Sequence, residues 1–318
     1  MNDTAQGKLM AVPELKKAAF VAVVGRPSVG KSTLVNLLCG EKVAIVSAVP
    51  QTTRNAIRGI VNRDEGQLVF VDTPGRHASE KKLNKKLMSI SDRSMEEADL
   101  ILYVLDASRP PVVEHPTKFP PEEEAIACRL LPLTEKVIAA VNKIDARGAD
   151  CEKINLFLQE KLPGIKSEHC FKVSALKDEG TGPLLACLFD LAPAGDAFYP
   201  VDYYTDQDVQ FRIAEIIREK AISRLREELP HSLYVDVADT ELRDDGKKLW
   251  IRAFIVTERE SQKGMVVGKG GGMIKSIRQA AQKDLNRIFE WKIELDLRVK
   301  TAHDWRHNDG LLKKLIDR

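Results

Sequence analysis

The stretch VVGRPSVGKST, residues 23–33, decides the fold of the first half of this 318-residue chain. It fits the pattern G-x-x-x-x-G-K-[ST] and lies between a β-rich run (18–24) and a helical run (33–38), which is the context that a phosphate loop needs. Glycines let backbone N–H groups face a phosphate, and the following helix adds its positive dipole end. Lys31 should reach the β- and γ-phosphates and Ser32 should ligate Mg²⁺. The residues expected to contact nucleotide here are Gly25, Arg26, Pro27, Ser28, Val29, Gly30, Lys31, Ser32 and Thr33.

Further β-rich runs follow the loop, and each ends in polar residues. They are QLVFVDTPG (67–75), DLILYVLDAS (99–108), KVIAAVNKID (136–145) and HCFKVSAL (169–176), with helical periods between them. This alternation predicts an α/β domain over residues 18–194, with a mostly parallel sheet covered by helices on both faces. Ligands of such sheets bind at the carboxyl ends of the strands, where these polar residues fall.

The NKID stretch (142–145) favours guanine over adenine. Asp145 at a strand end can accept hydrogen bonds from the ring N–H and the exocyclic amine of guanine, whereas adenine offers neither donor at that edge. Asn142 and Lys143 would brace the loop, and a backbone N–H of SAL would bind the guanine carbonyl. The predicted base site therefore comprises Asn142, Lys143, Asp145, Ser174, Ala175 and Leu176.

Two shorter motifs point to the γ-phosphate and its metal ion. Asp72 of DTPG (72–75) would hold Mg²⁺ through water, and Gly75 would bring a backbone N–H close to the γ-phosphate. Either Thr52 or Thr53 of PQTTR (50–54) would complete the shell when GTP is bound; we assign Thr53, and a solvated hydroxyl is the alternative. The predicted Mg²⁺ ligands are Ser32, Thr53 and Asp72, and the predicted catalytic residues are Lys31, Thr53 and Gly75.

The second half of the chain has a different pattern. Prolines, a glycine and aspartates at 195–207 predict a linker. A helix, a β-hairpin around RDDG, a glycine loop, another helix and a strand then predict an α+β domain over 208–300, followed by a C-terminal helix at 301–318. Residues 1–17 are expected to be a flexible tail.

The second glycine loop, GKGG at 268–271, lacks the spacing of a nucleotide phosphate loop. Residues 261–283 carry five basic residues and no acidic one, although the net charge of the whole chain is only +2. A G-x-x-G between two helices beside a sheet is how KH domains clamp an RNA backbone, and an ordinary turn with a solvated basic face is the alternative. The candidate RNA-binding residues are Lys263, Gly268, Lys269, Gly270, Gly271, Lys275 and Arg278.

Composition excludes several other classes. The hydrophobic share of 43 % and the charged share of 30 % are those of a globular domain protein. Five cysteines without a C-x-x-C pair argue against a disulfide framework or a zinc site. No secretory signal and no run of about 18 apolar residues occurs, so we expect a cytoplasmic protein.

Together these motifs resemble those of the Era family, which are bacterial P-loop GTPases with a C-terminal type II KH domain. The resemblance covers residues 18–300 and rests on GRPSVGKSTLVN, PQTTR, DTPG, NKID, SAL, YPVDYYTD, FRIAEIIREKA and QKGMVVGKGGGMIKSI. It implies slow GTP hydrolysis with Mg²⁺, binding of 16S rRNA near its 3′ end, and a part in 30S subunit assembly and rRNA maturation. We expect a monomer, and some family members also associate peripherally with the cytoplasmic face of the inner membrane.

Two positions depart from the family. Members commonly have Asn where Ser28 stands, and in related GTPases that Asn helps to hold a catalytic potassium ion, so potassium activation is in doubt here. Arg76 follows Gly75, where Ras-like enzymes have a water-orienting Gln, and we favour a solvent-facing Arg76 over one that contacts phosphate.

Two other functions stay open at this point. In the first, the protein is an RNA-binding assembly factor in which the nucleotide only stabilises the fold. In the second, the basic helix docks on a membrane surface or on another protein, although Ile274 and Ile277 are expected in the domain core, which leaves little apolar face for docking.

Overall fold

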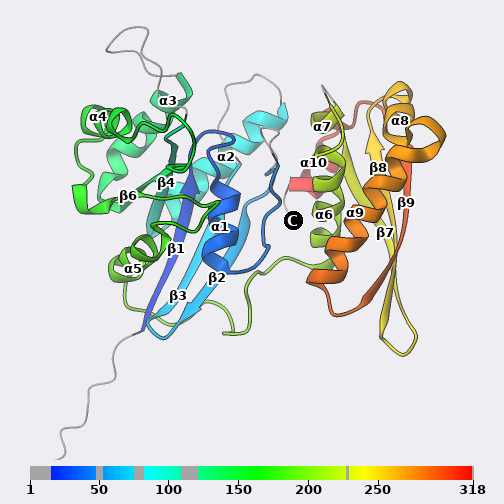
Figure 1. Cartoon of the computed structure of the whole chain (residues 1–318), viewed down its shortest axis with the longest axis horizontal. Coiled ribbons are helices and arrows are strands. Elements are labelled where there is room, and N and C mark those ends of the chain that lie inside the picture. Colours follow the sequence, from blue (N-terminus) through cyan, green and yellow to red (C-terminus); the bar gives the residue numbers. More distant parts are fainter. Residues whose placement is uncertain (1–15, 48–52, 75–81, 109–120, 227–228, 317–318) are drawn as a thin grey trace, which may run out of the picture.

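The computed structural model describes residues 16–47, 53–74, 82–108, 121–226 and 229–316, which form two domains side by side (Figure 1). The first domain contains a six-stranded sheet in the order β2-β3-β1-β4-β5-β6. All neighbouring strands are parallel except β2 and β3. The strands are β1 (Lys17–Val24), β2 (Ile57–Arg63), β3 (Gly66–Asp72), β4 (Leu100–Asp106), β5 (Val137–Asn142) and β6 (Cys170–Lys172).

Helices cover both faces of this sheet, as predicted. On one face α1 (Lys31–Cys39) and α5 (Thr181–Leu191) pack through a core that includes Leu34 and Leu188. On the other face a separate core includes Met95, Ile126 and Phe157. These residues belong to α2 (Lys82–Glu97), α3 (Pro121–Leu130) and α4 (Cys151–Lys161), and two 3₁₀ turns, η1 (Leu131–Lys136) and η2 (Ser167–His169), precede β5 and β6.

Strand β2 was missing from the sequence prediction. It is an edge strand, IRGIVNR, and Gly59 in its middle weakens the β signal. The glycine is needed for packing, because a Cβ at residue 59 would lie 2.6 Å from Sγ of Cys39 on α1.

The second domain contains the helix, hairpin, helix and strand that the sequence predicted, and two short helices, one before the hairpin and one before the glycine loop, that were not listed in that prediction. A three-stranded sheet, β7-β8-β9, joins β7 and β8 as an antiparallel hairpin and β8 and β9 as a parallel pair. Its helices share one core with the inner sheet face, including Ile217, Ile277 and Ala281. The elements are α6 (Val209–Ile222), α7 (Leu229–Ser232), β7 (Tyr234–Arg243), β8 (Lys248–Thr257), α8 (Glu260–Val267), η3 (Lys269–Gly271), α9 (Gly272–Ile288) and β9 (Lys292–Thr301).

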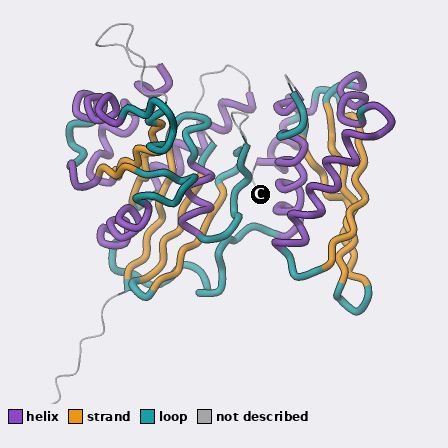
Figure 2. The backbone as a smooth tube through the Cα atoms, in the orientation of Figure 1, coloured by secondary structure: helices purple, strands orange, loops and turns teal. Residues whose placement is uncertain are grey.

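The segment predicted as a linker is bound to the first domain along its length. The Ile60 amide of β2 donates to the carbonyl of Tyr204, and the Gln67 side chain accepts from the amides of Phe198 and Tyr199. Figure 2 shows this segment as a loop that runs beside the β2 edge before it reaches α6. The linker thus covers an edge strand whose backbone groups would otherwise be open to pairing.

The last described elements lie between the two domains. Here η4 (Trp305–His307) and α10 (Asp309–Ile316) follow β9, and α10 sits beside α6 on the side that faces the first domain (Figure 1). Trp305 and Leu312 form a small apolar cluster with Tyr234 and with Ile90 of α2. None of the helices in the described ranges is long and apolar enough to cross a membrane.

Candidate functional site

The phosphate loop lies at the carboxyl edge of the six-stranded sheet, at its topological switch point. Strand β1 has β3 on one side and β4 on the other, and α1 begins at Lys31 directly after the loop. A crevice forms where neighbouring connections leave a sheet in opposite directions, and the free N–H groups of α1 point into this one. The position therefore suits an anionic group.

Lys31 is held inside the loop. Its side chain is 7 % exposed, and its Nζ donates to the carbonyls of Gly25 and Arg26, both at 3.0 Å. Burial lowers the pKa of Lys31 to about 8, although the carboxylates of Asp72 and Glu123 act in the opposite direction. A phosphate bound in the loop would add negative charge beside Nζ of Lys31 and stabilise its protonated form.

Ser32, Thr53 and Asp72 converge, as the predicted Mg²⁺ site requires. The Ser32 hydroxyl lies 2.5 Å from Oδ2 of Asp72 and 3.1 Å from the Thr53 hydroxyl, which is itself 3.3 Å from Oδ2. Asp72 is fully buried, and its Oδ1 has no hydrogen-bond partner among the described residues. Burial raises the pKa of Asp72, whereas Lys31, Ser32 and Thr53 lower it.

These residues fit Mg²⁺. They offer hard oxygen atoms from one carboxylate and two hydroxyls, and phosphate and water oxygens can complete the shell that Mg²⁺ requires. In the described residues, no three His, Cys, Asp or Glu side chains converge on a point, so a site built from those groups alone is not seen.

Asn142 ties together the loops that would enclose the base. Its Nδ2 donates to the carbonyl of Val29 at 2.9 Å, and its Oδ1 accepts from the amide of Ala175 at 3.0 Å. Gly30 must be a glycine here, because it has φ +100° and a Cβ would lie 2.4 Å from Nδ2 of Asn142. The NKID and SAL segments are thereby fixed to the phosphate loop.

Asp145 stands at the rim of this enclosure. Ser174 donates to Oδ1 of Asp145 at 2.6 Å, and this bond lowers the pKa of the carboxyl group, so Asp145 is ionised at neutral pH. Leu176 in the neighbouring SAL segment is 80 % exposed. An exposed apolar side chain near an ionised acceptor is suited to a base that stacks and donates two hydrogen bonds.

Two buried carboxylates of this site escaped the sequence analysis. Asp106, at the end of β4, accepts from Nζ of Lys143 at 2.6 Å, and the same Nζ donates to the Ser28 carbonyl at 2.7 Å. Glu123 of α3 pairs with Arg26 of the phosphate loop and accepts from the Tyr103 hydroxyl. Asp106 could have been found, because the apolar run that forms β4 ends in polar residues. Glu123 is revealed only by its tertiary contacts.

Three single residues discussed from sequence, Thr52, Gly75 and Arg76, fall outside the described ranges, so the assignment of Gly75 to the γ-phosphate remains a prediction. Residues 1–15 of the predicted tail also fall outside them, whereas Lys17 already belongs to β1.

The second glycine loop joins α8 to α9. Gly268 has φ +72°, and a Cβ there would lie 2.7 Å from Cβ of Met273, which explains the glycine. At Gly270 and Gly271 a Cβ would meet no atom within 4 Å, so the backbone is open to close approach from solvent. The loop therefore presents bare backbone at the start of a 17-residue helix.

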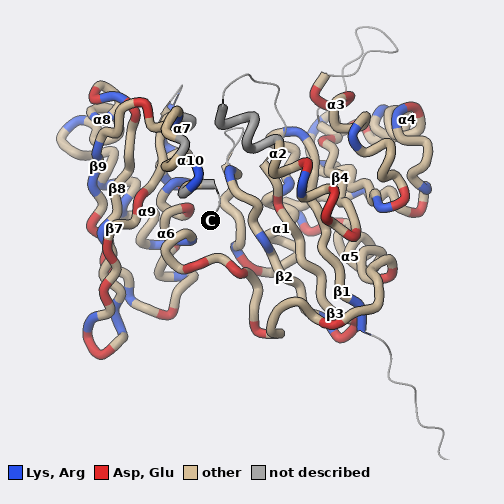
Figure 3. The backbone as a smooth tube through the Cα atoms, turned by 180° about the vertical axis from the view of Figure 1, so that it is seen from behind, with Lys and Arg blue, Asp and Glu red and all other residues tan. Residues whose placement is uncertain are grey.

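Basic residues surround this loop. Lys269 and Lys275 are exposed, whereas Lys263 pairs with Glu260 at 2.8 Å. Arg278, one turn beyond Lys275, lines an open groove of about 520 Å³ together with Trp250. Away from the glycine loop the charge is mixed: Figure 3 shows acidic and basic residues alternating along the β7–β8 hairpin of the second domain.

Each of the two domains matches a known protein family. A family model described as 50S ribosome-binding GTPase matches residues 20–143, and one described as KH domain matches residues 228–306. Fold and site thus define a P-loop GTPase that carries a KH domain, and the α/β plus α+β fold prediction is confirmed.

The chain belongs to the Era family of GTPases. It is 51 % identical to the GTPase Era of Treponema denticola, covering 94 % of this chain and 99 % of that protein, and 45 % identical to that of Borreliella burgdorferi, covering 95 % and 100 %. A single-residue variant of Aquifex aeolicus Era bound to GDP·AlF₄⁻ matches with a TM-score of 0.86 at 34 % identity, covering 94 % of this chain and 98 % of that one. A solved Era complex with MgGDPNP and nucleotides 1506–1542 of 16S rRNA gives the same TM-score and identity, covering 95 % and 98 %.

Proposed function

We propose that this protein is a slow GTPase that binds 16S rRNA near its 3′ end through its KH domain and acts in assembly of the 30S subunit. The observation that carries the proposal is that one chain combines the Ser32–Thr53–Asp72 cluster and the Asp145 rim with an open GKGG loop. The related Era protein solved with MgGDPNP and 16S rRNA nucleotides supports the same pairing of ligands.

Each part of the nucleotide site has a role that follows from its position. The N–H groups of the phosphate loop and Lys31 bind the phosphates, Ser32, Thr53 and Asp72 hold Mg²⁺, and Asp145 selects guanine. Mg²⁺, when bound, neutralises charge on the β- and γ-phosphates. Intrinsic turnover is slow because Arg76 stands where Ras-like enzymes have the glutamine that orients water.

The KH loop binds RNA through its backbone. Gly270 and Gly271 let a phosphodiester approach, and Lys269, Lys275 and Arg278 supply positive charge. Binding that depends on such contacts falls as the salt concentration rises.

We further propose that the protein acts as a cytoplasmic monomer without potassium activation. Flotation with anionic vesicles tests peripheral membrane association.

An RNA titration tests the function. A labelled RNA with the 3′ end of 16S rRNA, and a scrambled control, would be titrated in the presence of GDPNP or GDP. The Lys269→Asp/Gly270→Asp variant should lose binding. The matched control Lys283→Asp/Arg287→Gln makes the same change in charge at exposed positions toward the far end of α9 and should retain it.

The outcomes separate the candidate functions. Preference for the true sequence that is stronger with GDPNP than with GDP supports a GTP-controlled RNA-binding protein. Equal affinity in both nucleotide states favours an assembly factor in which the nucleotide is structural. Full binding by the loop variant would contradict the assignment of the second glycine loop.

A further inference from the structure

Arg54 connects the Mg²⁺ site to the second domain. It follows Thr53 in the chain, but its side chain points away from the nucleotide site. Its Nη1 donates to the carbonyl of Leu233 at 2.9 Å, and its guanidinium carbon lies 5.8 Å from the centre of the Trp305 ring. Thr53 thus lies in the predicted Mg²⁺ site, while the adjacent Arg54 contacts the second domain.

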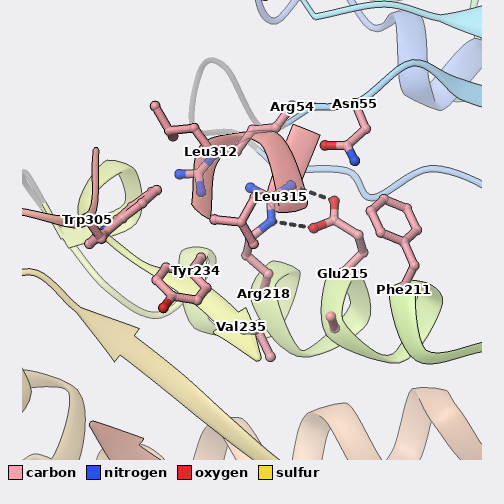
Figure 4. Close-up of a pocket in the computed structure, with 11 residues that line it drawn as sticks. Arg54, Asn55, Phe211, Glu215, Arg218, Tyr234, Val235, Trp305, Leu312 and Leu315 are labelled. Carbon is pink, nitrogen blue, oxygen red and sulfur yellow. Dashed lines mark hydrogen bonds and ion pairs between the residues drawn. The ribbon is translucent and has the colours of Figure 1, made fainter. Parts of the chain in front are cut away.

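The side chain enters a pocket that both domains form. The cavity of about 40 Å³ is lined by Arg54 and Asn55 of the first domain and by residues of α6, β7 and the C-terminal segment, including Trp305 and Leu312 (Figure 4). We call Leu233, Trp305 and Leu312 the Arg54 socket. The Trp305 indole N–H donates to the carbonyl of Ser232 at 3.1 Å, so the ring is fixed in place.

Charges around the socket are also ordered. Glu215 accepts two hydrogen bonds of 2.6 Å from Arg218 on the same helix, as Figure 4 shows. A planar guanidinium is suited to this setting because it can donate to a carbonyl and lie near an indole at once.

The chain that leads to Thr53 from the other side is held by the same domain. The Val46 amide donates to Oε1 of Glu219 on α6 at 3.0 Å, and Lys42 pairs with Glu219 at 2.6 Å and with Asp284 of α9 at 3.3 Å. Both described flanks of residues 48–52 therefore contact the second domain.

We propose that Arg54 is a positioning residue that, by anchoring in the socket, holds Thr53 in the Mg²⁺·GTP shell, so that the second domain completes the GTP-selective part of the nucleotide site. This rests on the proposed function, in which Thr53 is a ligand only when GTP is bound. A hydroxyl held in place binds without the entropic cost of ordering its loop. By linkage, GTP binding must in turn favour the docked arrangement of the two domains.

The test compares affinities for Mg·GDPNP and Mg·GDP. Arg54→Met, which keeps the apolar stem, should weaken GDPNP binding about tenfold, which corresponds to about 1.4 kcal/mol. Its affinity for GDP should stay within about twofold of the wild type, because GDP does not recruit the loop that bears Thr53. Arg54→Lys should show an intermediate loss.

A double-mutant cycle separates positioning from general stability. If Arg54 acts through Thr53, Thr53→Ala/Arg54→Met should lose no more GDPNP affinity than Thr53→Ala alone. The matched control is Arg58→Ala, which removes an exposed ion pair with Asp206 of the linker and should change neither affinity. Additive losses, or equal losses for GDP and GDPNP, would overturn the proposal.

The socket can also be changed from the second domain. Leu312→Ala should reproduce the selective loss of GDPNP affinity although residue 312 is far from the loop in sequence, with thermal unfolding used to show that the variant is folded. Unchanged GDPNP affinity in folded Leu312→Ala and Arg54→Met proteins contradicts the inference. Failure of wild-type protein to bind either nucleotide would instead refute the proposed function.

Discussion

Asn142 shows how one side chain can organise a nucleotide site through contacts with the protein alone. Its amide group donates to the Val29 carbonyl and accepts from the Ala175 amide, so it joins loops that follow three different strands. It is 2 % exposed, which makes both bonds costly to lose.

Asn142→Ala should therefore lower the free energy of unfolding by about 1–3 kcal/mol and weaken GDP and GDPNP binding to the same extent. Asn142→Asp should lose at least as much, because a carboxylate accepts from Ala175 but places a buried negative charge against the Val29 carbonyl oxygen, to which it cannot donate. Chemical denaturation and nucleotide titration measure both effects. A selective loss for one nucleotide would show that Asn142 is not a shared brace.

Ser28 allows a direct test of ion dependence. It is exposed, has φ +63°, and its carbonyl accepts from Lys143. GTP turnover by the wild type should be the same within about twofold in potassium and sodium buffers, since a single hydroxyl replaces an amide oxygen at this position. Ser28→Asn is expected to gain potassium stimulation. Strong stimulation of the wild type by potassium would contradict the interpretation of Ser28.

Sequence alone predicted the candidate site residues that stand at fixed spacing within motifs, such as Lys31, Ser32, Asp72 and Asn142. These motifs work because the backbone between their residues sets the geometry. Glu123 could not be found this way, because it meets Arg26 across 97 positions and nothing local requires a carboxylate there. Arg54 is the last residue of the PQTTR motif, but its partner Leu233 lies 179 positions away.

At the scale of single elements, α1 begins in the phosphate loop and ends against the edge strand β2. Lys31 and Ser32 begin the helix, and Cys39 ends it, packed against the position of Gly59 in β2. Burial raises the pKa of the Cys39 thiol from 9.0 to about 12. The thiol is therefore protonated throughout the physiological range.

Alkylation by iodoacetamide at pH 8 should accordingly modify exposed Cys128 and spare Cys39, for which about one thiol in 10⁴ is ionised.

The same thiol should make stability depend on pH. Because its folded pKa lies above the unfolded value, the stability that Cys39 contributes is complete below pH 9 and falls by about 1.4 kcal/mol per pH unit as pH rises toward 12. In Cys39→Ala, the free energy of unfolding should not show this decrease between pH 9 and pH 12. Peptide mass spectrometry and denaturation at several pH values measure the two effects, and rapid labelling of Cys39 in folded protein would contradict them.

Elements with strong periodicity were predicted well, and the missed one has a physical reason. The four inner strands of the first sheet are continuous apolar runs, as strands buried on both faces must be. Strand β2 is an edge, and its partner on the outer side is the segment predicted to be only a linker. A local pattern could not show that Ile60 pairs with Tyr204.

For the whole molecule, one group of polar contacts between the two domains converges on two carboxylates. Lys42 is central, since it reaches both Glu219 and Asp284, and Lys220 contacts the same two carboxylates. Composition and periodicity give no information on such pairs.

A thermodynamic cycle of Lys42→Met and Glu219→Gln should give a coupling energy of about 0.5–3 kcal/mol in unfolding, because Glu219 is 5 % exposed. The pair is partly buried, so the coupling should persist in about 1 M salt. The exposed i,i+4 pair Arg93–Glu97 is the control, with a coupling of about 0.3–0.5 kcal/mol. Equal couplings for both pairs would mean that the interdomain contact is not specific.

The first domain begins and ends at one place. The amide of Gly195 donates to the carbonyl of Lys16 at 2.9 Å, and the amide of Ala18 donates to that of Pro193 at 3.0 Å. A unit whose two ends meet can be inserted into a loop of another protein, or have its ends joined and be reopened elsewhere, without strain on its core. A different RNA-binding or protein-binding domain could therefore follow residues 16–195 and the linker that covers β2, in the place of the KH domain.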